Sequence, residues 1–219
     1  MLKASRPEAY KLLHDGIQAL SRVEDNGIRV DEQYLLAAME RSKKVIKSLQ
    51  NQMKESDLGR RWRRMFGEKA KFTSGDQLAT VLRKEGFELP VTENSKKYPK
   101  GDKRIKHKTD IEALEKIEHP FIALHLEHAK HQKVFGTYLK GIQRELVNGR
   151  VHVGFHLHRA VTYRGSSSQF NFQNLPIRDP EQGALIRKCF IPSKGRRLIE
   201  VDYGGIEVCI AACYHKDHG

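Results

Sequence analysis

The hydrophobic pattern of this 219-residue chain changes period near residue 148, and that change limits the folds available to it. Up to Leu146, apolar residues recur at the three- and four-residue spacing of amphipathic helices. After Asn148-Gly149 the spacing becomes alternation, as in a strand with one buried face. The alternating apolar residues are Val151, Val153, Phe155 and Leu157. The sequence therefore predicts an α+β fold, in which a mostly helical region precedes strands.

Turn residues divide the first part of the helical region. Between residues 7 and 50 the pattern predicts two helices that are separated at Asn26-Gly27, and Asp31 is a suitable N-cap for the second. The predicted apolar side of that second helix consists of Leu35, Leu36, Met39, Val45, Ile46 and Leu49.

Two further signals place helices later in the chain. Ser74 and Gln77 have the spacing of a capping box, which predicts a short helix that ends near Gly86. From residue 110 to 146 helical spacing returns, and Pro120 is expected to separate a short helix from a long one.

The charge of the chain favours a polyanionic partner. Lys and Arg number 40 against 27 Asp and Glu, giving a formal net charge of +13. Nucleic acid is the first candidate and an anionic membrane surface the second. No apolar run has the length of a membrane span, and the N-terminus lacks the apolar core of a signal peptide. We therefore expect a cytoplasmic protein.

The three cysteines bear on the redox environment of the chain. Their number is odd, and Cys189, Cys209 and Cys213 each have apolar neighbours in the sequence. Buried free thiols fit this pattern better than a disulfide framework. The expected compartment is therefore reducing.

Two basic segments each allow two interpretations. Residues 60–71, RRWRRMFGEKAK, form either a phosphate-contacting surface anchored by Trp62 or a solvated helix end whose tryptophan packs inward. Residues 92–110 form either a mobile solvated loop or an arm along a phosphate backbone. The sequence leaves both questions open.

Three histidines, His125, His128 and His131, lie three residues apart on the predicted long helix. A zinc site would need additional close ligands in tetrahedral geometry, and the sequence places no Cys or paired His motif beside them. Histidines that face solvent or nucleic acid are therefore the favoured interpretation.

A candidate metal site lies near the C-terminal end of the sequence. An apolar run from Leu198 to Val201 precedes Asp202, and Gly204-Gly205 follows, which is typical of a buried strand that delivers a carboxylate to its end. Glu207 supplies a second carboxylate five residues later. Residues 162–178 are rich in short hydrogen-bonding side chains suited to sugar, phosphate and groove-edge contacts. Together these segments suggest a site where a metal ion meets a nucleic acid.

Several motifs occur in a specific order over nearly the whole chain. They are Gly27-Ile28-Arg29-Val30-Asp31, Phe72-x-Ser74-x-Asp76-Gln77-Leu78, Lys103-Arg104, His119-Pro120, Lys133 with Thr137-Tyr138, Thr162-x-Arg164-x-Ser166-Ser167, Asn171-Phe172-Gln173-Asn174-Leu175-Pro176, Arg178, Phe190 and Val201-Asp202-Tyr203-x-x-Ile206-Glu207. In this order and spacing they closely resemble the family A DNA polymerases, the bacterial DNA polymerase I group. The resemblance implies an N-terminal helical palm segment at residues 1–28 and a helical thumb at 29–146. It implies the first antiparallel strands of the palm at 147–219, incomplete without fingers and the rest of the palm.

The resemblance also implies roles for individual residues. Asp202 would be one of two carboxylates that bind two Mg²⁺ ions, with help from the backbone carbonyl of Tyr203, and Glu207 would select deoxynucleotides. The residues expected to hold primer-template DNA are Lys103, Arg104, Lys133, Thr162, Arg164, Ser166, Ser167, Gln173, Asn174 and Arg178. The implied function is template-directed DNA synthesis from deoxynucleoside triphosphates, in replication or repair.

The sequence also departs from the family pattern. Tyr163-Arg164-Gly165 stands where the family often has Gly-Arg-Leu, and Gly204-Gly205 replaces a common Ser-Gln pair beside the nucleotide site, which bears on fidelity. The chain stops before the fingers helix and before the His-Asp-Glu motif. We therefore expect residues 1–219 to be inactive alone, as a truncated product or as a subunit completed by a second polypeptide that carries the fingers and the remaining palm.

Two alternative functions remain. The first is a non-catalytic duplex DNA-binding module that keeps the thumb grip. The second, a metal-dependent nuclease that uses Asp202 and Glu207, ranks lower because the resemblance offers no water-activating group. A physical corollary is an open palm sheet whose uncovered apolar face would promote association. That face would comprise Leu198, Ile199, Val201, Ile206, Val208 and Ile210.

Overall fold

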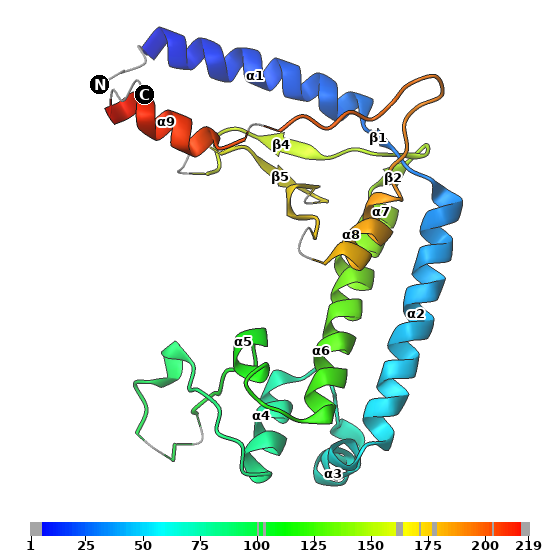
Figure 1. The fold of residues 1–219 in the computed structure, drawn as a ribbon, viewed down its shortest axis with the longest axis vertical. Coiled ribbons are helices and arrows are strands. Elements are labelled where there is room, and N and C mark those ends of the chain that lie inside the picture. Colours follow the sequence, from blue (N-terminus) through cyan, green and yellow to red (C-terminus); the bar gives the residue numbers. More distant parts are fainter. Residues whose placement is uncertain are drawn as a thin grey trace. The chain divides into compact units, whose positions relative to one another are not determined.

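The structure is a computed structural model that describes residues 6–99, 101–102, 104–160, 164–170, 172–176, 179–202 and 204–215. The chain divides into two compact units: residues 1–35 with 141–219, and residues 36–140. The predicted α+β class is confirmed, because the fold is mostly helical with small antiparallel sheets (Figure 1). Within the ranges just given, no helix is long and apolar enough to cross a membrane.

The first unit contains a small three-stranded antiparallel sheet in the order β1-β3-β2. Helix α1 (Arg6–Asn26) ends at Gly27, whose φ of 56° allows the chain to turn into β1 (Ile28–Arg29). The tight turn between β2 (Leu146–Val147) and β3 (Arg150–Val151) uses Asn148 and Gly149, both with positive φ. Both predicted Asn-Gly breaks therefore coincide with turns.

The rest of the first unit consists of a two-stranded ribbon and two helices. Strand β4 (Gly154–His156) pairs antiparallel with β5 (Ser166–Ser168), followed by a short 3₁₀ turn, η4 (Phe172–Asn174). Helices α8 (Pro180–Arg187) and α9 (Ile206–His215) complete the unit. Three aromatic rings, of Phe170, Phe172 and Phe190, pack together with centroids 5.0 to 6.3 Å apart. They anchor the segment around η4 to the chain that follows α8.

The second unit is helical. Its helices are α2 (Glu32–Glu55, which begins in the first unit), α3 (Asp57–Phe66), α4 (Gly75–Lys84), α5 (Ile111–Leu114) and α6 (Pro120–Lys133). The 3₁₀ turns η1 (Gly67–Lys69) and η2 (Glu93–Ser95) lie between them. Helix α6 continues into a π-helical turn, η3 (Val134–Leu139), and then into α7 (Lys140–Arg144), which belongs to the first unit from residue 141 onward.

The predicted helix starts are confirmed by side-chain caps. Asp31 accepts a hydrogen bond from the backbone N–H of Tyr34 at 2.9 Å, and Pro120 occupies the first turn of α6. The Nδ1 atom of His119 accepts a bond from the N–H of Phe121 at 3.1 Å, an N-cap that the sequence pattern did not single out. Each cap satisfies a backbone donor that the helix itself leaves free.

The core of the second unit forms around Trp62, which is fully buried. It packs against α4 and the start of α6, with the Phe72 and Phe121 rings 5.0 and 6.0 Å from its own. The other buried members of this cluster are Met53, Leu58, Leu78, Ala79, Val81, Leu82, Leu89, Leu114 and Ile122. The inward-packing interpretation of Trp62 is therefore confirmed.

Residues 198–201 do not form the predicted buried strand. Leu198, Ile199 and Val201 are 63%, 84% and 83% exposed, and the segment has no regular structure. A strand needs a neighbour to pair its backbone groups, and among the described residues no strand lies against this segment. Ile206, Val208 and Ile210 lie on helix α9, so the predicted open sheet is wrong. The side chains of these three residues are nevertheless exposed, as predicted.

Two smaller predictions are also corrected. Leu36 and Val45, placed on the apolar side of α2, are exposed, because buried positions on that helix follow a narrower stripe. Cys189 is buried as expected, whereas Cys209 and Cys213 are exposed on α9. All three thiols are free, as the sequence predicted.

Candidate nucleic-acid interface

The basic segment of the second unit is a closed loop and not a free arm. Val91 and His107 form an antiparallel bridge at its base, so its two ends lie together. The N–H of Thr92 donates to the carbonyl of Lys106 at 2.9 Å, and the N–H of Lys108 donates to that of Pro90 at 2.7 Å. These bonds hold both ends of the segment together. Two of its lysines, Lys100 and Lys103, lie outside the described residues.

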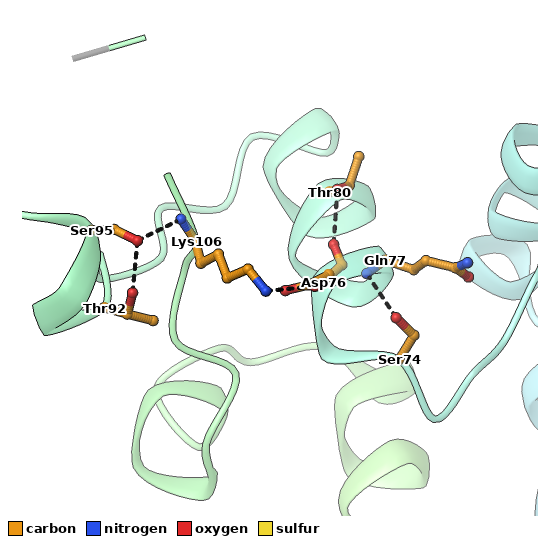
Figure 2. Close-up of polar contacts among 7 residues, drawn as sticks. All are labelled: Ser74, Asp76, Gln77, Thr80, Thr92, Ser95 and Lys106. Carbon is orange, nitrogen blue, oxygen red and sulfur yellow. Dashed lines mark hydrogen bonds and ion pairs between the residues drawn. The ribbon is translucent and has the colours of Figure 1, made fainter. Parts of the chain in front are cut away.

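A buried serine stabilises this loop from inside (Figure 2). Ser95 is 4% exposed, and its hydroxyl accepts the N–H of Lys106 and the hydroxyl of Thr92, each at 2.9 Å. The Lys106 ammonium reaches Asp76 of α4 at 3.3 Å. The loop is thereby fixed at its centre and to the neighbouring helix.

Arg104, a predicted DNA-binding residue, is held by its neighbours. Its guanidinium donates to Asp102 at 3.1 and 2.7 Å and lies 4.3 Å from the ring centroid of Tyr98. The same hydrogen bonds lower the pKa of the Asp102 carboxyl. Arg104 is still exposed, so its remaining donors are accessible to a phosphate.

A cavity of about 630 Å³ lies between α4 and the loop. Its lining includes the cations Arg83, Arg104 and Lys106, the imidazole of His107 and the carboxylates of Asp76 and Asp102. Burial, with the nearby charge of Arg83, lowers the pKa of His107, so this imidazole is neutral at pH 7. The cavity presents guanidinium and ammonium donors of the kind that bind phosphate oxygens.

The basic helix α3 turns its arginines outward because Trp62 is fixed inward. The Trp62 indole N–H donates to the side-chain oxygen of Gln77 at 2.9 Å, which also accepts the N–H of Lys71 at 2.8 Å. Ser74 accepts the N–H of Gln77 at 3.3 Å, but Gln77 does not return a bond to Ser74. The predicted capping box is therefore half formed, because Gln77 binds the indole instead.

The arginines of α3 are partly engaged within the protein. Arg60 pairs with Asp57 at 2.6 Å, Arg61 pairs with Glu85, and Arg63 donates to the carbonyl of Lys54 at 3.0 Å. Arg64 is exposed. The alternative interpretation, in which α3 contacts phosphate, stays a prediction that rests on Arg63 and Arg64.

The histidines of α6 are not the surface group that the sequence favoured. His128 is 1% exposed, and neither its Nε2 atom nor Nδ1 of His125 has a hydrogen-bond partner within the described part of the chain. Burial, with the nearby His128, lowers the pKa of His125 to about 4; burial, with His131, also lowers that of His128. His131 contacts Glu127 at 3.0 Å. Lys133, at the end of the same helix, is exposed.

In the first unit, the described primer-holding candidates lie just before β5, on it and after it. Gln173 donates its amide to the carbonyl of Gly165 at 3.1 Å and, like Asn174, is exposed. Ser166 and Ser167 are half-buried on β5, opposite His156 and Phe155. Thr162, Arg178 and Tyr203 lie outside the described residues.

The two predicted catalytic carboxylates are both exposed. Glu207 lies 3.7 Å from Arg164, and the side chains of this pair are 77% and 78% exposed. Asp202 is exposed in the irregular segment before α9. Over the ranges that the structure describes, no three His, Cys, Asp or Glu side chains gather as metal ligands. Among these described residues, Asp202 and Glu207 therefore do not belong to a three-ligand cluster.

Sequence reasoning missed Arg150, a half-buried residue that connects segments of the first unit. Its guanidinium donates to the carbonyls of Asn26 and Gly27 at 2.8 and 3.2 Å and to the Ser193 hydroxyl at 2.9 Å. These partners are far apart in the sequence, and no local motif marks them.

Comparisons with known proteins show which family this chain resembles in sequence. A model of the DNA polymerase family A matches residues 39–219. The chain is 31% identical over 205 residues to DNA polymerase I of Caldicellulosiruptor bescii, covering 92% of this chain and 22% of that one. It is 36% identical over 198 residues to DNA polymerase I of Deinococcus radiodurans, covering 88% and 19%. The chain thus spans about a fifth of the length of these relatives.

A solved structure shows the same likeness in three dimensions. It is the POL domain of Pol1 from M. smegmatis in complex with DNA primer-template and dNTP. The match has a TM-score of 0.67 at 30% identity and covers 92% of this chain and 33% of that one.

Proposed function

Because the chain belongs to the DNA polymerase family A, we propose that residues 1–219 grip primer-template DNA and contribute one metal-binding carboxylate to template-directed DNA synthesis. The observation that carries this proposal is the likeness over 92% of the chain to a polymerase domain bound to primer-template and dNTP. The formal charge of +13 supports the same conclusion, since duplex DNA is a polyanion. The physiological setting that we propose is replication or repair.

We propose that residues 29–146 form the thumb and that residues 1–28 and 147–219 belong to the palm. The compact unit at residues 36–140 lies within the proposed thumb. In it, Arg104 and Lys133 are exposed cations suited to backbone phosphates, and we assign Lys103 the same role. These contacts would hold a duplex without reading its sequence.

At the proposed primer terminus, Arg164, Gln173 and Asn174 supply groove-edge contacts, together with Thr162, Ser166, Ser167 and Arg178. Arg164 and Gln173 each offer several N–H donors to the acceptors that every base pair presents in the minor groove. The pair between Arg164 and Glu207 is exposed, and such pairs contribute at most about 1 kcal/mol, so DNA can displace it. Glu207 is then free for its proposed role at the sugar 2′ position.

Family A polymerases use Mg²⁺. We propose Asp202 as one ligand of that metal, helped by the carbonyl of Tyr203. We propose that residues 1–219 do not extend a primer by themselves, because their sequence contains neither the fingers helix nor the His-Asp-Glu motif that the family pattern leads us to expect. The second carboxylate and the triphosphate-binding groups would have to come from further residues, in a longer chain or in a second polypeptide.

The exposure of Asp202 keeps one rival open, a duplex-binding module without catalytic use of this carboxylate. A primer-extension assay with labelled primer-template, Mg²⁺ and deoxynucleoside triphosphates separates the two. When the remaining palm and fingers are supplied, the Asp202→Ala variant should lose extension by at least a hundredfold and keep its primer-template affinity within twofold. Full extension by that variant would favour the module, and extension by residues 1–219 alone would contradict the proposal.

A further inference from the structure

A groove of about 420 Å³ lies inside the second unit and is lined by residues of α2 and of the helical stretch of α6 and η3. Its wall on α2 carries Lys43, Lys47, Gln50 and Lys54, and Gln132 and Phe135 line the opposite side. None of the residues that the proposed primer-template contacts use lies in this groove. It is a separate basic surface.

The groove is cationic because three lysines line it and none of the described lining residues is a carboxylate. By contrast, the cavity between α4 and the basic loop contains Asp76 and Asp102. Lys43 is paired with Glu40, whereas Lys47 and Lys54 make no ion pair within the residues that the structure describes. Two uncompensated ammonium groups therefore face any ligand that enters.

The spacing of these two lysines suits an extended anionic strand. Lys47 and Lys54 are exposed and lie seven residues apart, which is two turns of helix and about 10.5 Å along its axis. That distance corresponds to about three stacked nucleotides of one strand. The groove itself has the volume of a small-molecule site, which is too small to admit a duplex.

The opposite wall adds an aromatic ring. Phe135 is half-buried and lies on the π-helical turn η3. Single π-helical turns are frequent at functional sites. The Lys140 ammonium lies 5.1 Å from the centroid of the Phe135 ring. A Cβ on Gly136 would meet no atom within 4 Å apart from its chain neighbours and the backbone of its own helix, so there is open space beside this turn. A partly exposed ring next to cations is the arrangement on which bases of single strands stack. The amides of Gln50 and Gln132 add donors and acceptors for base edges.

We propose that this groove binds a single-stranded nucleic-acid segment, with its phosphates on Lys47 and Lys54 and a base against Phe135. An acidic peptide would satisfy the lysines but would leave the ring and the amides without a specific role. The proposal extends the proposed function, since it adds a single-strand contact to a protein that grips a duplex elsewhere.

Fluorescence anisotropy on the full 219-residue chain tests the groove, with labelled dT20 and a blunt 20-base-pair duplex as probes. In the Lys47→Gln/Lys54→Gln variant, the slope of log affinity for dT20 against log salt should become less negative by about 1.4. Its dT20 affinity should fall about tenfold, and Phe135→Leu should lower that affinity by a similar factor. Affinity for the duplex should stay within twofold in both variants.

The matched control is Lys11→Gln/Lys116→Gln, which removes the same charge from exposed positions outside the groove and should change dT20 affinity less than twofold. Three results would overturn the proposal. They are an equal loss of dT20 affinity in this control, an equal loss of duplex affinity in the groove variant, and an unchanged salt slope for dT20 in the groove variant. Displacement of dT20 by a heptaglutamate peptide would also overturn it.

A second measurement needs no variant and so does not depend on refolding. Photo-crosslinking of the wild-type chain to dT20 that contains 5-iododeoxyuridine should modify the peptide that carries Phe135. Crosslinks confined to other peptides would contradict the groove. Failure of the proposed function would instead show as absent primer-template binding by the wild-type chain.

Discussion

Replacing Trp62 by alanine should destabilise the second unit by about 3 to 5 kcal/mol. The indole is fully buried, contacts the Phe72 and Phe121 rings, and donates its N–H to Gln77. The substitution creates a cavity at the centre of the cluster and removes that hydrogen bond. Since domains are stable by only about 5 to 15 kcal/mol, the loss is a large share of the total.

Urea denaturation followed by circular dichroism measures this effect, because the variant lacks the only tryptophan and its fluorescence. The control is Arg64→Ala on the exposed side of the same helix, which should change the free energy of unfolding by less than about 0.5 kcal/mol. Equal stability of Trp62→Ala and wild type would mean that α3 does not pack as described.

The second large effect is a loss of stability in acid. The pKa of His125 is lowered from 6.5 to about 4 by burial and by His128, so folding keeps this imidazole neutral. The unfolded chain binds the proton more readily. Stability from this group is therefore complete above pH 6.5 and is lost as the pH falls from 6.5 to 4. The shift corresponds to about 3 kcal/mol, and the lowered pKa of His128 acts in the same direction.

The measurement is the free energy of unfolding against pH for wild type and for His125→Phe, which cannot take up a proton. The difference between the two curves isolates His125 from carboxylates that titrate in the same range. It should be constant above pH 7 and shift by about 3 kcal/mol in favour of the variant by pH 4. Parallel curves would show that His125 is solvated.

Local signals predicted the helical part of the fold well. Asp31, Ser74 and Pro120 each mark a helix start, because capping is decided by residues within one turn. The change of period after Asn148 likewise corresponds to the first hairpin of the sheet. Such features need no knowledge of distant parts of the chain.

The errors concern partners that lie far away in the sequence. The run from Leu198 to Val201 has the composition of a buried strand, yet it is exposed and has no pairing strand in the described part of the chain. His128 has a polar side chain at helical spacing, and only the tertiary packing of α6 buries it. Gln77 was identified as a cap, but one partner of its side chain is the indole of Trp62, which lies fifteen residues earlier on another helix.

The candidate site was predictable only as an ordered set of motifs. The order of Arg164, Gln173, Asp202 and Glu207 indicated the family, and the family match supports it. The sequence predicted the positive charge of the basic loop. It did not predict the hydrogen bond to Ser95, the contact of Arg104 with the Tyr98 ring or the cavity beside Arg83, because these depend on side-chain contacts that no periodicity encodes. Sequence gives the donors, and the tertiary structure decides which of them face a ligand.

The most direct test of the central claim is the salt dependence of primer-template binding by the purified 219-residue chain. If the proposed thumb and palm residues grip the duplex through at least four phosphates, log affinity should fall with log salt at a slope of about −3.6 or steeper. The slope should be the same for primer-templates of unrelated sequence. Absence of binding at about 50 mM salt, or a slope near zero, would contradict the account.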